Sequence, residues 1–100
     1  MIIEKTETYT NWFEKQTDVK LIARIQVRLR KLEKENYFGE TNLIQPASCR
    51  VSELKIHYGA GYRIYYKQKN KNTIVLLLCA GSKGSQKKDI EKAKRLAEEN

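Results

Sequence analysis

Residues 49–67 read CRVSELKIHYGAGYRIYYK, and apolar and polar side chains alternate along them. A period of two is typical of strands that have one apolar and one polar face. Gly59-Ala60-Gly61 interrupts the alternation, so the stretch is expected to form two antiparallel strands joined by a tight connection. The apolar face would hold Tyr62, Ile64 and Tyr66. The polar face would gather four side chains that can contact a polar ligand: Lys55, His57, Arg63 and Tyr65.

The segment that follows is apolar on both faces. After a polar turn at residues 69–72, residues 73–80 contain the run Ile-Val-Leu-Leu-Leu-Cys, which is typical of a buried central strand. With the two preceding strands it predicts an antiparallel meander of three. Residues 81–85 end this strand, and Ser85 is expected to cap a last helix over residues 86–99.

The N-terminal half predicts one strand and two helices. Residues 2–8 are expected to form a short edge strand, and Thr10-Asn11 to cap a short helix that ends at Lys15. Asp18 is expected to cap a longer helix over residues 19–35, because its apolar residues recur at helical spacing: Ile22, Ile25, Leu29 and Leu32.

Residues 36–48 follow neither period and contain the only proline, so they predict a loop. The fold class is therefore α+β, in one domain over residues 1–100. The expected order is an N-terminal strand, two helices, an antiparallel three-strand meander and a C-terminal helix.

Composition narrows the class of protein. The chain has 100 residues, of which 40% are hydrophobic and 32% charged, which suits a single domain with its own core. No apolar run approaches the roughly 18 residues that span a bilayer, and Glu4 and Lys5 are charged too early for a signal peptide, so we expect a cytoplasmic protein without a membrane partner. Cys49 and Cys79 have no metal-binding spacing, and neither a metal nor a cofactor is expected.

Net charge suggests the kind of partner. The chain carries +8, and residues 49–100 hold twelve basic and five acidic side chains, which is +7 of that total. A basic half on a small domain favours a polyanion such as nucleic acid, although a solvated basic face would give the same count.

The polar face of the predicted strands has the side chains needed to cleave RNA without a metal. Such cleavage needs a base for the 2′ proton, cations on the phosphorane oxygens and a donor for the 5′-oxygen. Arg63 suits bidentate phosphate contact, Lys55 or His57 can act as base or acid, and Lys83 leaves the central strand beside them. With one histidine, a two-histidine ribonuclease is excluded. Asp89 and Glu91 are expected on a helix surface, which disfavours a two-metal nuclease.

A second set of side chains is expected to contact RNA or the ribosome. Lys87 and Lys88 lie in the first turn of the last helix, where an anion is favoured, although both can equally be solvated. Tyr65 can stack on a base or donate a hydrogen bond. The full set of predicted contacts comprises Arg50, Tyr65, Lys67, Lys87 and Lys88.

Three segments together resemble a known family. They are residues 53–66 (ELKIHYGAGYRIYY), 76–86 (LLLCAGSKGSQ) and 89–94 (DIEKAK). Gly-x-Gly-Tyr-Arg-Ile-Tyr followed by Gly-x-Lys-x-Ser-Gln resembles the bacterial addiction-module killer proteins, the HigB-like branch of the RelE/ParE toxin superfamily. The resemblance covers nearly the whole chain and implies the RelE-like fold.

The resemblance also implies an activity and a partner. It implies a toxin of a type II toxin–antitoxin system, a ribosome-dependent and metal-independent endoribonuclease that cleaves mRNA in the A site. The partners would be the ribosome, mRNA and a cognate HigA-like helix-turn-helix antitoxin. Arg63 matches the arginine of the Gly-Tyr-Arg block, and Lys83 matches a basic residue after the last core strand.

Two points remain open within the resemblance. Lys55 and His57 fall where ribosome-dependent relatives carry lysines, and the departure at His57 leaves the general base undecided. Relatives in the ParE branch inhibit DNA gyrase instead, and the fold does not separate the two activities. A non-catalytic nucleic-acid-binding module is the third alternative.

Overall fold

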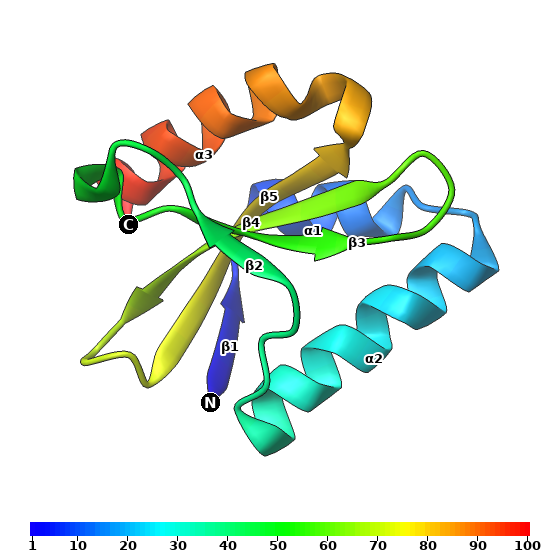
Figure 1. The fold of residues 1–100 in the computed structure, drawn as a ribbon, viewed down its shortest axis with the longest axis horizontal. Helices are drawn as coiled ribbons and strands as arrows, with labels where there is room; N and C mark the ends of the chain where they lie inside the picture. The colour runs from blue at the N-terminus through cyan, green and yellow to red at the C-terminus, as the bar shows by residue number, and fades with distance from the viewer.

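The computed structural model describes all of residues 1–100 as a five-stranded sheet with three helices (Figure 1). The strands are β1 (Ile2–Lys5), β2 (Thr41–Leu43), β3 (Ser52–Ile56), β4 (Tyr62–Lys69) and β5 (Ile74–Ser82). The helices are α1 (Glu7–Glu14), α2 (Val19–Glu35) and α3 (Gln86–Glu99). None of the three helices has both the length and the apolar content that crossing a bilayer requires.

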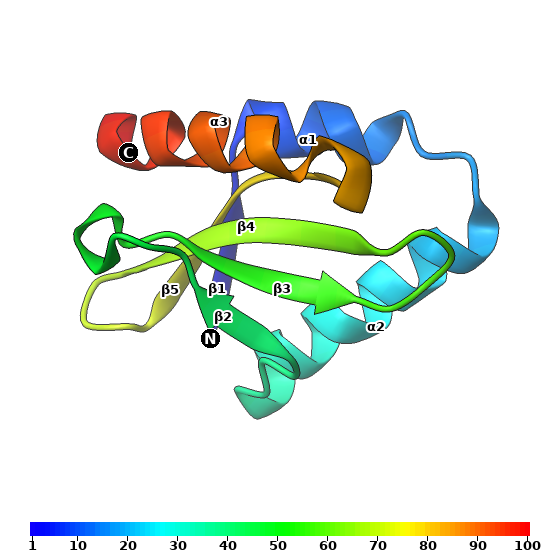
Figure 2. The same cartoon turned by 45° about the horizontal axis from the view of Figure 1, so that its top comes forward.

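The sheet has the order β1-β5-β4-β3-β2. The antiparallel pairs β3–β4 and β4–β5 form the predicted meander, and β1 is the predicted edge strand, paired in parallel with β5. The α+β class and the order of the predicted elements are thus confirmed. Figure 2 shows α3 on the side of the sheet opposite to α2.

Strand β5 is buried on both faces, as its unbroken apolar run predicted. Residues 75–81 are all buried. One face contributes Val75 and Leu77 to a core completed by α1 and α2, and the other contributes Leu76 and Leu78 to a second core under α3. Because both faces of this strand are apolar, a helix must cover each of them.

A β-bulge between β4 and β5 changes which residues face α3. Tyr65 pairs with Cys79 while Tyr66 pairs with Leu77, so that Leu78 has no partner in the register. Leu78 and Cys79 consequently both enter the second core. Alternation then resumes, which brings Gly81 to the α3 side of the sheet, opposite Arg63 on β4.

The first strand is shorter than predicted. It ends at Lys5 instead of Thr8, and α1 begins at Glu7, so Thr10-Asn11 lie inside the helix and do not cap it. The cap is Thr6, whose Oγ1 accepts a hydrogen bond from the Tyr9 amide at 3.1 Å and donates one to the Leu78 carbonyl at 2.6 Å. Residues at the start of this segment favour a strand, so the predicted strand extends past Thr6 and the cap is not recognised.

The predicted loop at residues 36–48 contains β2, a strand that the sequence did not predict. Its residues Thr41–Leu43 pair antiparallel with β3 and are all exposed, so they lack the apolar alternation that reveals a strand. A 3₁₀ turn at Ala47–Cys49 follows, with Arg50 in the left-handed conformation, and β3 therefore begins at Ser52 and not at Cys49.

The start of α3 is fixed to the sheet by a buried carboxylate. Ser85 occupies the N-cap position, but its hydroxyl donates to Asp89 Oδ2 and makes no bond to the helix backbone. Asp89 is buried, so its predicted place on the helix surface is wrong. Its carboxylate lies against Gly81, where a side chain would otherwise stand.

We expect Gly81→Ala to destabilise the fold by about 1–3 kcal/mol, because the structure would have to shift to admit the methyl group. A Cβ at position 81 would clash with Asp89 Oδ2 and would lie 2.6 Å from Ser85 Oγ. Gly84→Ala is the control, since its Cβ meets only Ser82 Oγ at 3.8 Å. Urea unfolding of the wild type and the two variants measures the difference in stability. Equal stability of the two variants would contradict the lack of space at Gly81.

Candidate functional site

The four predicted catalytic side chains meet around one hollow at the ends of β3 and β4. This hollow, of about 410 Å³, is lined by residues 55–63 and Lys83, and we call it the β3–β4 hollow. Lys55 and Arg63 are direct partners in the β3–β4 register, so their side chains lie on the same face of the sheet. The Lys83 amide donates to the Gly61 carbonyl at 3.0 Å, which holds the lysine at the rim.

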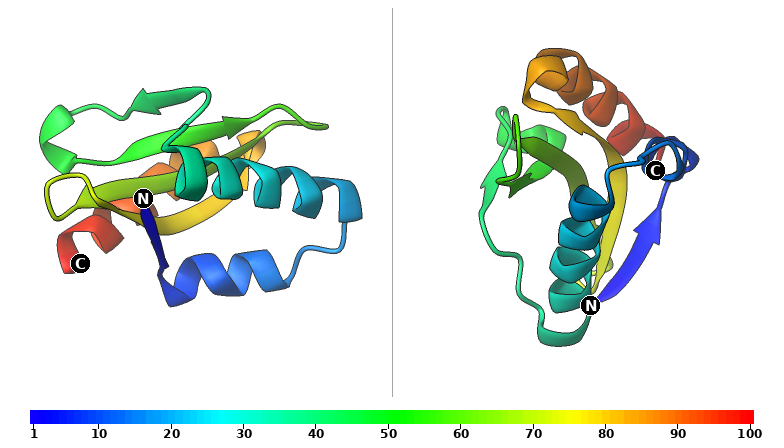
Figure 3. Two further views of the ribbon diagram at one scale, coloured as in Figure 1. Left: turned by 90° about the horizontal axis from the view of Figure 1, so that it is seen from below. Right: turned by 90° about the vertical axis from the view of Figure 1, so that its right-hand side faces the viewer.

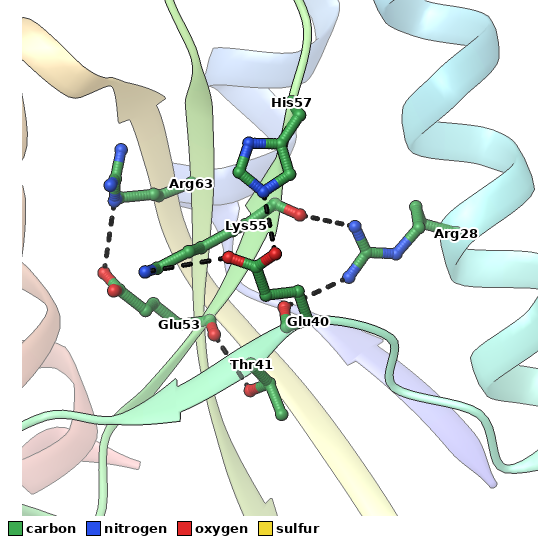
Figure 4. Close-up of polar contacts among 7 residues, drawn as sticks. All are labelled: Arg28, Glu40, Thr41, Glu53, Lys55, His57 and Arg63. Atoms are coloured by element: carbon green, nitrogen blue, oxygen red, sulfur yellow. Dashed lines mark hydrogen bonds and ion pairs between the residues drawn. The ribbon is translucent and has the colours of Figure 1, made fainter.

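Arg63 pairs with the carboxylate of Glu53, a residue that the sequence did not indicate as part of the site. Glu53 Oε2 lies 3.5 Å from Arg63 Nε, and the two side chains are 5% and 14% exposed. Neither of these atoms has a hydrogen-bond partner. Figure 4 shows the guanidinium end of Arg63 pointing away from Glu53. The charge pair therefore fixes the direction of Arg63 and leaves its terminal nitrogens free of protein partners.

Glu40 is a second carboxylate that the sequence did not reveal. Its Oε1 accepts a hydrogen bond from His57 Nε2 at 2.8 Å, and its Oε2 lies 3.7 Å from Lys55 Nζ (Figure 4). The hydrogen bond from His57 lowers the pKa of Glu40, and the charges of His57, Lys55 and Arg28 act in the same direction. An anion that enters the hollow has to compete with this carboxylate for Lys55 and His57.

Arg28 of α2 attaches the Glu40 segment to the helix. Its guanidinium donates to the carbonyls of Lys55 and Phe38, the latter at 2.8 Å, and to that of Glu40 at 3.3 Å. The backbone of Glu40 also accepts from the Lys55 amide at 3.0 Å. The sequence placed Arg28 only beside the apolar stripe of the helix and gave no signal of this structural role.

Tyr65 does not lie on an exposed polar face. It is fully buried in the second core, and burial raises the pKa of its hydroxyl. The prediction of a base-stacking tyrosine here is wrong, because α3 covers this part of the face that the alternation assigned to solvent. Only the end of that face, from Lys55 to Arg63, stays open.

The other four predicted RNA contacts lie away from the hollow. Lys67 Nζ donates to the Ala97 carbonyl at 2.8 Å, near the end of α3, and burial together with the nearby cations Lys69 and Arg50 lowers its pKa. Arg50 lies just before the start of β3, whereas the hollow lies at the other end of that strand. Lys87 and Lys88 line a different depression of about 630 Å³ on α3.

Comparison with known proteins places the chain among relatives by sequence and by structure. No family model matches it. It is 38% identical over 97 residues to an uncharacterized protein of Haemophilus influenzae, covering 97% of this chain and 93% of that protein. Identity and coverage at this level show that the two belong to one family.

Solved structures with a similar fold include RelE toxins. A free Escherichia coli RelE mutant superposes with a TM-score of 0.65 at 16% identity, covering 94% of this chain and 95% of that one. A chain of the intact E. coli RelBE toxin–antitoxin complex gives a TM-score of 0.62 at 12% identity, covering 81% of this chain and 94% of that one. A chain of the Mycobacterium tuberculosis RelBE2 complex gives 0.57 at 19%, over 82% and 96%.

We expect Glu53→Gln to lower the free energy of unfolding by about 1–3 kcal/mol, because it leaves the Arg63 charge poorly compensated in a mostly buried position. Glu4→Gln is the matched control, since Glu4 pairs with Lys69 at 3.3 Å on the exposed surface, where a pair contributes about 0–1 kcal/mol. Urea unfolding distinguishes the two. If Glu53→Gln loses no more stability than Glu4→Gln, the Glu53 carboxylate does not hold Arg63 in place.

We expect the pKa of Glu40 to rise toward its ordinary value of 4.5 in His57→Ala. The hydrogen bond from His57 favours the ionised carboxylate, so its removal makes protonation easier. Because the folded pKa is lowered, the contact is kept at neutral pH and is lost only as the pH falls through that lowered pKa. Carbon-detected NMR titration of the carboxyl group measures this. An unchanged Glu40 pKa in the variant would show that the contact does not persist in solution.

Proposed function

We propose that this chain, which has a RelE-like fold and belongs to one family with the Haemophilus influenzae protein, is a member of the RelE/ParE superfamily and the toxin of a type II toxin–antitoxin system. Its activity in this proposal is that of a ribosome-dependent, metal-independent endoribonuclease that cleaves mRNA in the A site. The observation that carries the proposal is the gathering of Lys55, His57, Arg63 and Lys83 around one hollow.

The proposed reaction is transfer of a phosphodiester to its own 2′-oxygen. The 2′ hydroxyl loses its proton, the 2′-oxygen forms a bond to phosphorus, and the bond from phosphorus to the 5′-oxygen breaks. The departing 5′-oxygen takes a proton, which leaves a 2′,3′-cyclic phosphate and a 5′-hydroxyl end. Negative charge grows on the phosphorane oxygens, so cations aimed at that point accelerate the reaction most.

Each side chain of the β3–β4 hollow has a role that suits its surroundings. Arg63, oriented by Glu53, contacts two phosphorane oxygens, and Lys55 beside it adds a second cation. His57 Nε2 is hydrogen-bonded to Glu40, which leaves Nδ1 as the ring atom that would take the 2′ proton. Lys83 at the rim donates the proton to the departing 5′-oxygen.

The charge of the chain supports two kinds of partner. Its net charge of +8 suits both an RNA substrate on the ribosome and an antitoxin that presents an acidic surface. We propose a cognate antitoxin as a partner, since toxin–antitoxin complexes are among the solved structures that share this fold. Its proposed HigA-like type rests on the sequence resemblance alone.

Primer extension on cellular transcripts after brief induction tests the proposal. We expect cuts inside translated codons with the wild-type chain, and a reduction of at least about 100-fold in Arg63→Ala, because one charge-stabilising donor contributes that much. Arg63→Lys keeps the charge near Glu53 but loses the bidentate geometry, so it should also be impaired while remaining folded. Arg95→Ala, at an exposed arginine of α3, should cleave normally.

Two other outcomes would refute the ribonuclease. Intact transcripts together with growth arrest and DNA-damage signalling would favour a gyrase inhibitor. Salt-dependent RNA binding without cleavage products would favour a non-catalytic nucleic-acid-binding module.

A further inference from the structure

Helix α2 exposes an apolar stripe on the face turned away from its buried residues. Val19, Ala23 and Val27 follow one another at intervals of four residues, and all three are exposed, Val19 by 77% and Val27 by 47%. The helix buries a different set in the core: Leu21, Ile25 and Leu32. A solvent-facing helix surface is ordinarily polar, so this stripe has the pattern of a contact surface.

The stripe borders a groove between α2 and the end of β3. This groove, which we call the α2 groove, has a volume of about 600 Å³ and an apolar floor of Ala23, Val27 and Ile56. Its edges carry the cations Lys20, Arg24 and Arg28. Figure 3 shows α2 alongside the sheet, with its N-terminal end near the loop that follows β3.

The walls of the α2 groove are held in place by polar contacts. Arg28 is bound to three backbone carbonyls, as described above. The Arg24 guanidinium lies 5.2 Å from the ring centroid of Tyr58, and the Tyr58 hydroxyl donates to Asp18 Oδ2 at 2.9 Å. The groove is thus a preformed surface, which lowers the cost of binding.

We propose that the α2 groove binds an acidic amphipathic helix of a partner protein. Lys20 and Arg28 are eight residues apart, so the groove runs for about 12 Å along α2, the length of about two helical turns. Apolar side chains of the partner helix would contact the exposed Ala23 and Val27, and flanking Asp or Glu side chains would pair with Lys20 and Arg24. An RNA strand would use the cations but not the exposed valines, so the apolar floor favours protein.

The position of the α2 groove gives the partner control over the site. Ile56 and His57 line both the α2 groove and the β3–β4 hollow. A helix bound in the groove therefore ends beside His57, where an acidic side chain can compete with a phosphate for the cations of the hollow. Identification of the partner as the antitoxin rests on the proposed function, whereas the chemistry of the groove does not.

Binding of designed peptides tests the groove directly. The probe is a fluorescein-labelled helical peptide of about 14 residues with leucines on one face and glutamates flanking them. The second peptide has lysines in place of the glutamates. We expect the acidic peptide to bind at least about tenfold more tightly, and Val27→Glu and Arg24→Glu each to weaken it at least about tenfold. Arg30→Glu makes the same charge change as Arg24→Glu on the same helix outside the groove, and should leave affinity unchanged.

Several results would overturn the proposal. They are no binding of the acidic peptide, equal binding of both peptides, or equal loss of affinity in Arg30→Glu. A single-stranded RNA probe whose affinity falls at Arg24 while peptide binding does not would assign the groove to RNA.

Cell growth separates this proposal from the proposed function. If the chain arrests growth, Val27→Glu should still do so, and should resist rescue by the protein encoded beside it. Peptide binding that depends on the groove in a chain without any cleavage activity would uphold the groove and reject the ribonuclease.

Discussion

Burial of β5 on both faces is the constraint from which the rest of the architecture follows. A strand with seven consecutive buried residues needs an apolar layer above and below it. On one side α2 and α1 supply this layer through Leu21, Ile25 and Tyr9, and on the other α3 supplies it through Ala93 and Ala97. The bulge at Leu78 adjusts the alternation so that β5 serves both cores along its length.

The candidate site exists because α3 covers only part of its face of the sheet. The first turns of α3 meet β5 at Gly81, where the Asp89 carboxylate occupies the space that a side chain at position 81 would fill. This contact determines where α3 stops covering the sheet. Beyond that point Arg63, Lys55 and Lys83 stand at the open end of the sheet, with Glu53 and Glu40 beside them. The two carboxylates keep closely spaced cations in place without a ligand, which is pre-organisation for an anion.

The sequence predicted the elements whose apolar residues recur at a regular spacing. The alternation around Leu54 and Ile64 and the apolar run of β5 predicted the meander, and the alternation also placed Lys55 and Arg63 on the same polar face. It did not predict β2, whose three exposed residues have no apolar pattern, or the early cap at Thr6. Contacts made across the fold have no local signal, so the roles of Glu40, Arg28 and Asp89 were not predictable. The prediction that Tyr65 contacts RNA was wrong for a related reason. Alternation distinguishes the two faces of a strand, but it does not indicate which part of a face a helix covers.

The end of β3 connects the two surfaces that carry the functional proposals. Side chains alternate along a strand, so Lys55 and His57 point to the hollow while Ile56 points to the core beneath α2. Arg28 binds the carbonyl of Lys55 and so ties this segment to the helix whose outer face forms the α2 groove. A partner seated on α2 would therefore act on the hollow through direct contact at His57 and through the Arg28 attachment of the Glu40 segment. Inhibition by such a partner would require no rearrangement of the sheet, because Ile56 and His57 already line both the groove and the hollow.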